Sequence, residues 1–268
     1  MEKARRPARP KKRPVQYRHE LKYYINRGDY EILSRRLRSC IQQDENAQRN
    51  GGEYFIRSLY FDSPFDDALW EKLSGVDERD KFRIRAYNGS PFDDALWEKL
   101  SGVDERDKFR IRIYNGQDDV IKLECKHKEG SYIAKQSIRL SRGECESLIR
   151  GDYAFLLSRK EPFARRMFAE FATKCLRPRV IVDYTREAYV YPVEDVRITF
   201  DKDIRTAYRG TSLFDMTQPT YPVITDGDLV LEVKFNNYLP SYIRELLQID
   251  SHTRSAVSKY CICRKFEF

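Results

Sequence analysis

Lysine, arginine and glutamate alternate with apolar residues in two short runs near the middle of the chain. The charged positions of these runs are spaced two apart, at Lys108, Arg110, Arg112, Lys122, Glu124 and Lys126. Residues two apart share one face of a β-strand, so each run predicts a strand with one charged and one apolar face. Arginine forks hold phosphate oxygens in pairs, and carboxylates hold divalent cations. These residue types indicate a site for a phosphate-rich anion and a divalent metal.

The same alternation recurs in other parts of the chain. It includes Arg18, Glu20, Lys22, Lys135, Ser137, Arg139, Arg179, Tyr184, Arg186, Arg197, Asp201, Arg205, Glu232 and Lys234. A half-exposed sheet with its charges in water is the ordinary explanation of one charged strand face. Because the pattern repeats over successive strands, we favour a sheet closed into a barrel with these faces inward. Its interior would be a cationic tunnel with a few carboxylates.

Turn and helix signals indicate the elements that position these residues. Asn115-Gly116 predicts a turn that joins the two central runs into a hairpin, and Ser141 with Glu144 forms a capping box. Further strands are expected at residues 17–25, 54–62, 131–140, 179–190, 195–200 and 229–235, and helices at 29–43, 141–150, 163–175, 240–247 and 255–263. We therefore expect an α+β fold with strands in the middle and helices packed outside.

The composition fits one β-rich domain that follows a basic tail. The 268 residues are 34% charged and 13% aromatic, and aromatic residues favour strands. No run approaches the roughly 18 apolar residues of a membrane helix, and no apolar core follows the first charges as in a secretory signal. Residues 1–14 carry seven Lys or Arg against one Glu and are rich in proline, which predicts a disordered tail. We expect residues 15–268 to form a single domain in the cytoplasm.

The cysteines do not predict a metal site. The six are Cys40, Cys125, Cys145, Cys175, Cys261 and Cys263, and none forms a CxxC pair. The three histidines do not group with them at zinc spacing. Reduced thiols are the expected state.

Residues 63–89 and 90–116 have nearly the same sequence. The two segments differ only at Ala86 versus Ile113. Repeat architectures normally contain at least three diverged units, so we interpret this pair as a 27-residue tandem duplication.

Each copy carries an RxR strand, and only one copy can occupy a given position in a barrel. We expect the second copy, with Arg110 and Arg112, to line the tunnel, because a tight turn ties it to the strand of Lys122. The alternative is the first copy, with Arg83 and Arg85.

Taken in order, eight segments resemble a known domain. RHELKYYI, IRSLYFD, KFRIRIYNG, IKLECK, VDYTREAY, ITFD, LEVKF and SKY resemble the VTC (vacuolar transporter chaperone) polyphosphate polymerase domain of the triphosphate tunnel metalloenzymes. The similarity runs over about residues 16–266 apart from one duplicated unit, and it rests on the order and completeness of the motifs. The resemblance implies an eight-stranded antiparallel β-barrel tunnel with helices packed outside. It also implies transfer of the ATP γ-phosphate to a growing polyphosphate chain, with Mn²⁺ or Mg²⁺ as cofactor.

The resemblance also implies roles for individual residues. The catalytic candidates are Arg110, Arg112, Lys122, Arg186, Arg197 and Lys259. The substrate-binding candidates are Arg57, Lys135, Tyr184 and Ser258, to which the alternating faces add Lys22, Lys126 and Lys234. The metal carboxylate falls on Glu232, with Glu20 and Glu124 as helpers. Residues 19–22 keep only the ExK of the ExExK found in many tunnel enzymes, which weakens a two-metal triphosphatase assignment.

Two other functions fit the same residues. Phosphoryl transfer needs positioning and charge neutralisation more than covalent help, which suits a polymerase that binds ATP and polyphosphate. A triphosphatase or polyphosphatase would instead need an ordered water, positioned by Glu20 or Glu124. A non-catalytic module that binds polyphosphate or inositol phosphates is the third possible function.

The expected partners follow from the main prediction. A membrane protein that exports the product, at the inner face of a membrane, is a candidate partner. No specific nucleic acid is expected.

Overall fold

The computed structural model describes residues 18–74, 105–129, 132–207, 210–224, 227–248, 254–255 and 257–266. The strands are β1 (His19–Ile25), β2 (Gln42–Gln43), β3 (Tyr54–Asp62), β4 (Glu105–Tyr114), β5 (Gln117–Glu129), β6 (Tyr132–Leu140), β7 (Arg177–Tyr191), β8 (Val196–Ala207), β9 (Tyr221–Pro222) and β10 (Leu229–Phe235). The helices are α1 (Arg27–Cys40), α2 (Glu45–Arg49), α3 (Asp67–Ser74), α5 (Arg142–Ile149), α6 (Phe155–Ser158), α7 (Pro162–Thr173), η1 (Val193–Asp195), α8 (Ser241–Leu246) and α9 (Lys259–Lys265). The predicted tail of residues 1–14 lies outside the described residues.

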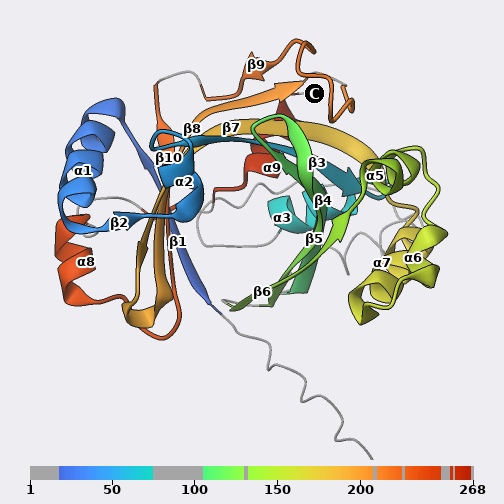
Figure 1. Ribbon diagram of the computed structural model, residues 1–268, viewed down its shortest axis with the longest axis horizontal. Helices are drawn as coiled ribbons and strands as arrows, with labels where there is room; N and C mark the ends of the chain where they lie inside the picture. The colour runs from blue at the N-terminus through green and yellow to red at the C-terminus, as the bar shows by residue number, and fades with distance from the viewer. Residues whose placement is uncertain are drawn as a thin grey trace, which may run out of the picture.

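One curled antiparallel sheet organises the fold. Its strands follow the order β1-β10-β8-β7-β3-β4-β5-β6, and β2 and β9 pair with β7 and β8 beside this path. Figure 1 shows the sheet bent into an arch, with α1 and α8 outside one end and α5–α7 outside the other. Residues of α9 pack against the inner side of the sheet, beside Tyr60, Val182 and Tyr184. The two edge strands come together where Arg18 and Ile133 form an isolated antiparallel bridge. The predicted α+β class and the eight-stranded antiparallel barrel are confirmed.

Most predicted elements form, with shifted ends. Helix α1 begins after Asn26, whose side chain accepts a hydrogen bond from the Asp29 N–H, and it ends at Cys40 rather than at residue 43. It ends early because Gln42 and Gln43 pair with β7. The strand predicted at residues 195–200 continues to Ala207. None of the described helices has the length and apolar character needed to cross a membrane.

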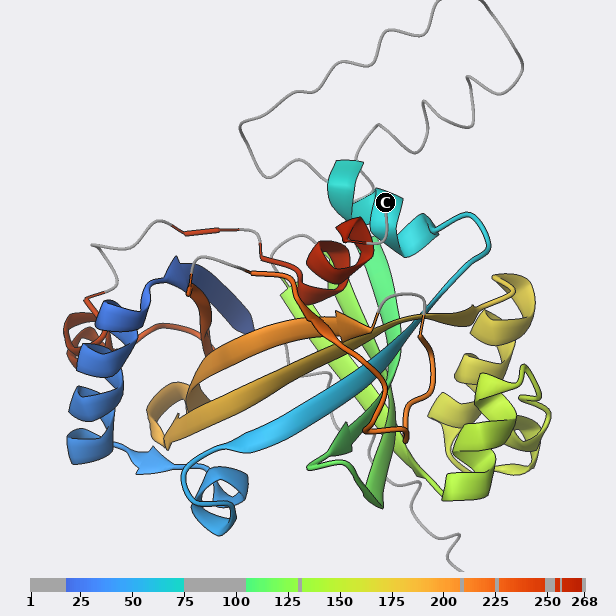
Figure 2. The same cartoon turned by 90° about the horizontal axis from the view of Figure 1, so that it is seen from above.

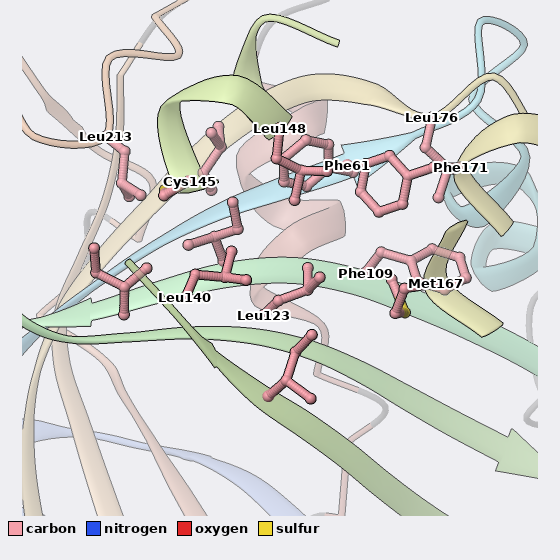
Figure 3. Packing of buried hydrophobic residues seen from close by; sticks show 14 of the residues in the cluster. Phe61, Phe109, Leu123, Leu140, Cys145, Leu148, Met167, Phe171, Leu176 and Leu213 are labelled. Atoms are coloured by element: carbon pink, nitrogen blue, oxygen red, sulfur yellow. The ribbon is translucent and has the colours of Figure 1, made fainter. Parts of the chain in front are cut away.

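Helices cover the outer face of the sheet in two places. A core that includes Phe61, Phe109, Leu123, Met167 and Phe171 lies between β3–β6 and the group α5–α7 (Figure 3). A second core packs α1 and α8 against β1, β10 and β8. The predicted capping box of Ser141 and Glu144 forms at the start of α5. Because the outer face is apolar, the alternating charged side chains lie on the inner face.

Within the described residues, each copy of the duplicated unit contributes one element. Helix α3 comes from the first copy, and β4 comes from the second, between β3 and β5. Ile113, where the copies differ, is fully buried in the core under α5–α7. Arg83 and Arg85 lie outside the described residues.

Candidate functional site

The register of the sheet decides which residues meet on the inner face. The cross-strand neighbours include Arg112 with Ser58, Arg110 with Tyr60, Arg110 with Glu124, Lys126 with Lys135, Arg186 with Asp201 and Lys22 with Glu232. Directly opposed residues in a sheet share a face. The alternation seen in the sequence therefore becomes a single charged inner surface that is built from strands far apart in the chain.

A first cluster forms around Glu124, whose side chain is almost fully buried. Its Oε2 accepts a hydrogen bond from Arg110 Nε at 2.8 Å, and its Oε1 lies 2.5 Å from Lys135 Nζ. Arg112 Nη1 is 3.8 Å from Oε2. Burial alone would raise the pKa of Glu124, but Arg112, Arg110 and Lys135 hold this pKa far below its ordinary value. Glu124 is thus a fixed anion that orients three cations.

Tyrosine hydroxyls orient the same two arginines from β3 and β7. Arg110 Nη1 donates to the Tyr60 hydroxyl at 2.8 Å, and Arg112 Nη2 donates to the Tyr184 hydroxyl at 3.1 Å. Burial would raise the pKa of Tyr184, yet the nearby Arg112 and Arg186 lower it. Neutral hydroxyls can release a guanidinium to a phosphate at small cost, because they carry no charge to be left unpaired.

A second cluster forms around Asp201, which is fully buried. Arg186 donates to both of its oxygens, at 2.6 and 2.8 Å, and Lys259 Nζ lies 2.5 Å from Oδ2. Glu232 Oε2 is 3.9 Å from both Arg186 and Lys259, and its Oε1 is 2.7 Å from Lys234 Nζ. Sequence analysis assigned no role to Asp201, although its alternation with Arg197 and Arg205 marks it as a residue of the charged face.

Glu20 lies where β1 approaches the opposite edge of the sheet. Lys126 Nζ on β5 is 2.5 Å from its Oε2, and Lys234 and Lys22 lie 3.6 and 3.7 Å from its Oε1. Burial would raise the pKa of Glu20, but these three lysines keep it well below its ordinary value. The ion pair with Lys126 joins the edge strand β1 to β5, the strand next to the opposite edge strand β6.

Partial burial makes several lysines of the inner face unusually weak bases. It lowers the pKa of Lys108 and of Lys135 to about 7, and the pKa of Lys126 and of Lys234 to about 8. The pKa of Lys22 is also well below its ordinary value, first because of burial. A bound polyanion would favour the charged form of each of these lysines.

Three of the predicted residues lie apart from these clusters. Arg57 points to the outer face, where it is buried and its Nη2 and Nε lie 2.7 and 2.9 Å from the Asp183 carboxylate. Arg197 donates to Asp44 at 2.6 Å. Lys122 Nζ lies 5.6 Å from the centre of the Tyr114 ring. The structure does not bring Arg57 to the inner face, because odd-numbered residues of β3 face outward there.

The C-terminal segment adds two predicted residues, Ser258 and Lys259, to the inner surface. Ser258 caps α9 by accepting from the Cys261 N–H, and it also accepts from Lys108 Nζ at 2.7 Å. Lys259 reaches the Asp201 cluster, as described above. Helix α9 is held to the rest of the fold by Tyr260, whose hydroxyl donates to the buried Asp62. Thus Ser258 has both a capping contact and a contact with an inner-face lysine.

Two carboxylates of the inner face, Glu20 and Glu232, lie on either side of Lys234. Among the described residues, no three His, Cys, Asp or Glu side chains gather closely enough to hold a metal by themselves. Glu20 Oε1 is nevertheless buried without a hydrogen bond, and Lys234 lies between Glu20 and Glu232. Glu232 and Glu20 are hard oxygen ligands that suit Mn²⁺ or Mg²⁺ if phosphate oxygens complete the coordination.

Comparisons with known proteins agree with this architecture. The family model of the VTC domain matches residues 17–98 and 89–268, and the two matches overlap at the duplicated unit. A proposed adenylyl cyclase from Hippeastrum, reported to have a dominant triphosphatase activity, is similar with a TM-score of 0.52 and 14% identity over 95% of this chain and 97% of that chain. A proposed adenylate cyclase from Bacillus halodurans is similar with a TM-score of 0.50 and 11% identity over 91% and 94%. At these identities the two structures show a shared fold alone. No curated protein sequence matches the chain.

Proposed function

The chain belongs to the VTC domain family, within the triphosphate tunnel metalloenzymes, and from this premise we propose that it is an ATP-dependent polyphosphate polymerase. It would transfer the γ-phosphate of ATP to a growing polyphosphate chain inside the barrel. We further propose that residues 15–268 act as one domain, because the described strands all join one sheet.

The observation that carries the proposal is the pairing of every carboxylate described above on the inner face. Glu20, Glu124, Asp201 and Glu232 each contact at least one lysine or arginine within 2.8 Å. A carboxylate held in this way is a weak base, so it is poorly suited to activate water. The same cations are well suited to neutralise a chain of phosphates.

This arrangement matches the chemistry of chain extension. An oxygen of the terminal phosphate of the acceptor chain attacks the γ-phosphorus of ATP, a new P–O bond forms, and the bond to the bridging β–γ oxygen breaks. ADP leaves with the electron pair of that bond. The attacking oxygen is already anionic, so no strong general base is required. Arg110, Arg112 and Arg186 would bind the non-bridging oxygens, where charge accumulates in the transition state.

A divalent cation fits beside these residues. Glu232, helped by Glu20, would hold it, and when bound it supplies charge neutralisation between neighbouring phosphates. Lys234 Nζ lies 2.7 Å from Glu232 Oε1. This contact would have to break for the cation to bind that oxygen.

A metal-dependent triphosphatase is the second candidate. It is favoured by the triphosphatase activity reported for the similar Hippeastrum structure. Its water would have to be positioned by Glu20 or Glu124. A non-catalytic module that binds polyphosphate is the remaining alternative.

One assay separates these functions. The purified chain is incubated with ATP and Mn²⁺, polymer is resolved on a gel, and ADP and free phosphate are measured. Long polymer with matching ADP is expected. Free phosphate without polymer would support the triphosphatase, and binding of tripolyphosphate without turnover would support the binding module.

A further inference from the structure

Helix α3 packs on a surface that is formed by the end of β3, by β7 and by α9. The Asp62 side chain accepts hydrogen bonds from the Ala68 and Leu69 N–H groups, at 2.9 and 3.2 Å. Ala68 and Leu69 are buried in a core with Tyr60 and Tyr260. Figure 2 shows α3 beside α9 at one end of the curled sheet. The helix is thus held both at its N-terminus and by its apolar face.

Ion pairs hold the turn that leads into α3. Asp66 Oδ1 lies 2.7 Å from Arg264 Nη2 and 3.4 Å from Arg179 Nε. Arg179 also donates to the Ser63 carbonyl at 2.8 Å. The side chains that receive the helix form the α3-binding surface, which consists of Tyr60, Asp62, Arg179, Tyr260 and Arg264.

The second copy of the duplicated unit repeats every residue that makes these contacts. Residues 63–74 and 90–101 are identical in sequence, SPFDDALWEKLS. The residues of the α3-binding surface occur once each, because they lie outside the duplicated unit. One surface therefore has two chemically equal helices available in the same chain. The counterparts of Ser63, Asp66, Ala68 and Leu69 are Ser90, Asp93, Ala95 and Leu96.

The connections of the chain allow either segment to reach this surface. Residues 63–74 follow β3 directly, whereas only residues 102–104 separate residues 90–101 from β4. Strands β3 and β4 are antiparallel neighbours, and α3 contacts β4 as well as β3. Residues 75–104, which lie outside the described residues, begin directly after α3 and end directly before β4. Whichever segment binds, one 27-residue unit remains as an extra connection, so the entropy of loop closure is nearly the same.

We propose that residues 90–101 also bind the α3-binding surface and exchange there with residues 63–74. The helix then comes from either copy, whereas β4 comes from the second copy, because Ile113 is fully buried and its counterpart is Ala86. Because the two helices make the same contacts, each occupies the surface in a substantial fraction of the molecules. This exchange does not depend on the proposed function.

The two tryptophans of the chain report the exchange, because each copy contains one. The full chain is labelled with fluorinated tryptophan and observed by fluorine NMR. In the variant Trp97→Phe with Leu96→Ala, Trp70 gives the resonance of a bound helix. Truncating the buried leucine of one copy should shift the occupancy toward the other copy at least about 30-fold.

The matched variant is Trp70→Phe with Leu69→Ala, in which only the second copy carries a tryptophan. Trp97 should then give the same resonance as the bound Trp70. If that resonance is absent, only the first copy binds, and the proposal is overturned.

Hydrogen exchange of α9 gives a second readout, from a segment outside the duplicated unit. Leu69→Ala and Leu96→Ala should each leave the α9 amides protected, because the other copy binds beside them. The two changes together should reduce this protection. A loss in Leu69→Ala alone, with no further loss when Leu96→Ala is added, would contradict the exchange. Protection of Leu69→Ala that rises with protein concentration would mean that the helix comes from a second molecule, which would also overturn an exchange within one chain.

Discussion

Replacing Arg110 and Arg112 by alanine should reduce polymerase activity far more than replacing Arg83 and Arg85. The two pairs have the same flanking sequence, so the second variant is a control from within the chain. Only Arg110 and Arg112 are described on the inner face, with Glu124 beside them. Each charge-assisted hydrogen bond to phosphate contributes about 1.5–3 kcal/mol, so losing two should lower kcat/KM by about 10²- to 10⁴-fold.

The strand of the first copy should not replace β4 in the Arg110→Ala, Arg112→Ala variant, because the two copies differ at one buried position. If its strand replaced β4, Ala86 would take the place of Ile113, which is fully buried. An isoleucine-to-alanine change in a core costs about 2–5 kcal/mol, so the exchanged sheet would be rarely populated.

Adding Ala86→Ile to the double variant removes this packing cost and should restore part of the activity. The assay is steady-state polymer synthesis, with thermal unfolding to check the fold. Equal losses for the two arginine pairs, or a loss confined to Arg83→Ala with Arg85→Ala, would refute the assignment of β4 to the second copy.

Four further outcomes are expected. Glu232→Gln should abolish Mn²⁺-dependent turnover and weaken Mn²⁺ binding in the presence of tripolyphosphate, with an unchanged circular dichroism spectrum; unchanged metal binding would contradict this. Asp183→Ala should destabilise the fold by about 3–5 kcal/mol, because it leaves Arg57 buried without its partner, and denaturant titration measures the loss. Tripolyphosphate affinity should fall as pH rises from 6 to 9, since Lys135 and Lys126 have pKa values of about 7 and about 8 and lose their charge in this range. Over pH 7–10 the ligand-free protein should gain stability with pH, because these lysines keep their ordinary, higher pKa in the unfolded chain, which therefore holds more protons; a stability that falls over this window would contradict the lowered values.

Most residues of the inner face could be predicted, because residues two apart in a strand share a face whichever strands pair. Arg110, Lys126 and Glu232 could be placed on one surface before their partners were known. Arg57 could not, since the strand YFIRSLYFD carries apolar or aromatic residues on both faces and its alternation gives no direction. Its bond to Asp183 depends on the β3–β7 register, which joins residues far apart in the chain.

The sequence also could not show which lysines of the inner face contact a carboxylate. Lys108 and Lys126 look alike in the alternating pattern, yet one contacts Ser258 and the other contacts Glu20. That difference follows from the path of the C-terminal segment and from the approach of β1 to β5 and β6. Asp201 was visible in the same pattern, but only the fold pairs it with Arg186 and Lys259.

The origin of α3 in the first copy and of β4 in the second has a consequence for the gene. Because the copies are identical except at residues 86 and 113, removing residues 63–89 or residues 75–101 yields the same protein sequence. Each deletion keeps a helix equivalent to α3 and a strand equivalent to β4, with isoleucine at the buried position. A deletion that removed any 27-residue stretch starting between residues 63 and 86 would therefore leave one and the same single-copy protein sequence. The duplication is reversible by many equivalent mutations, and none of them changes a residue of the inner face.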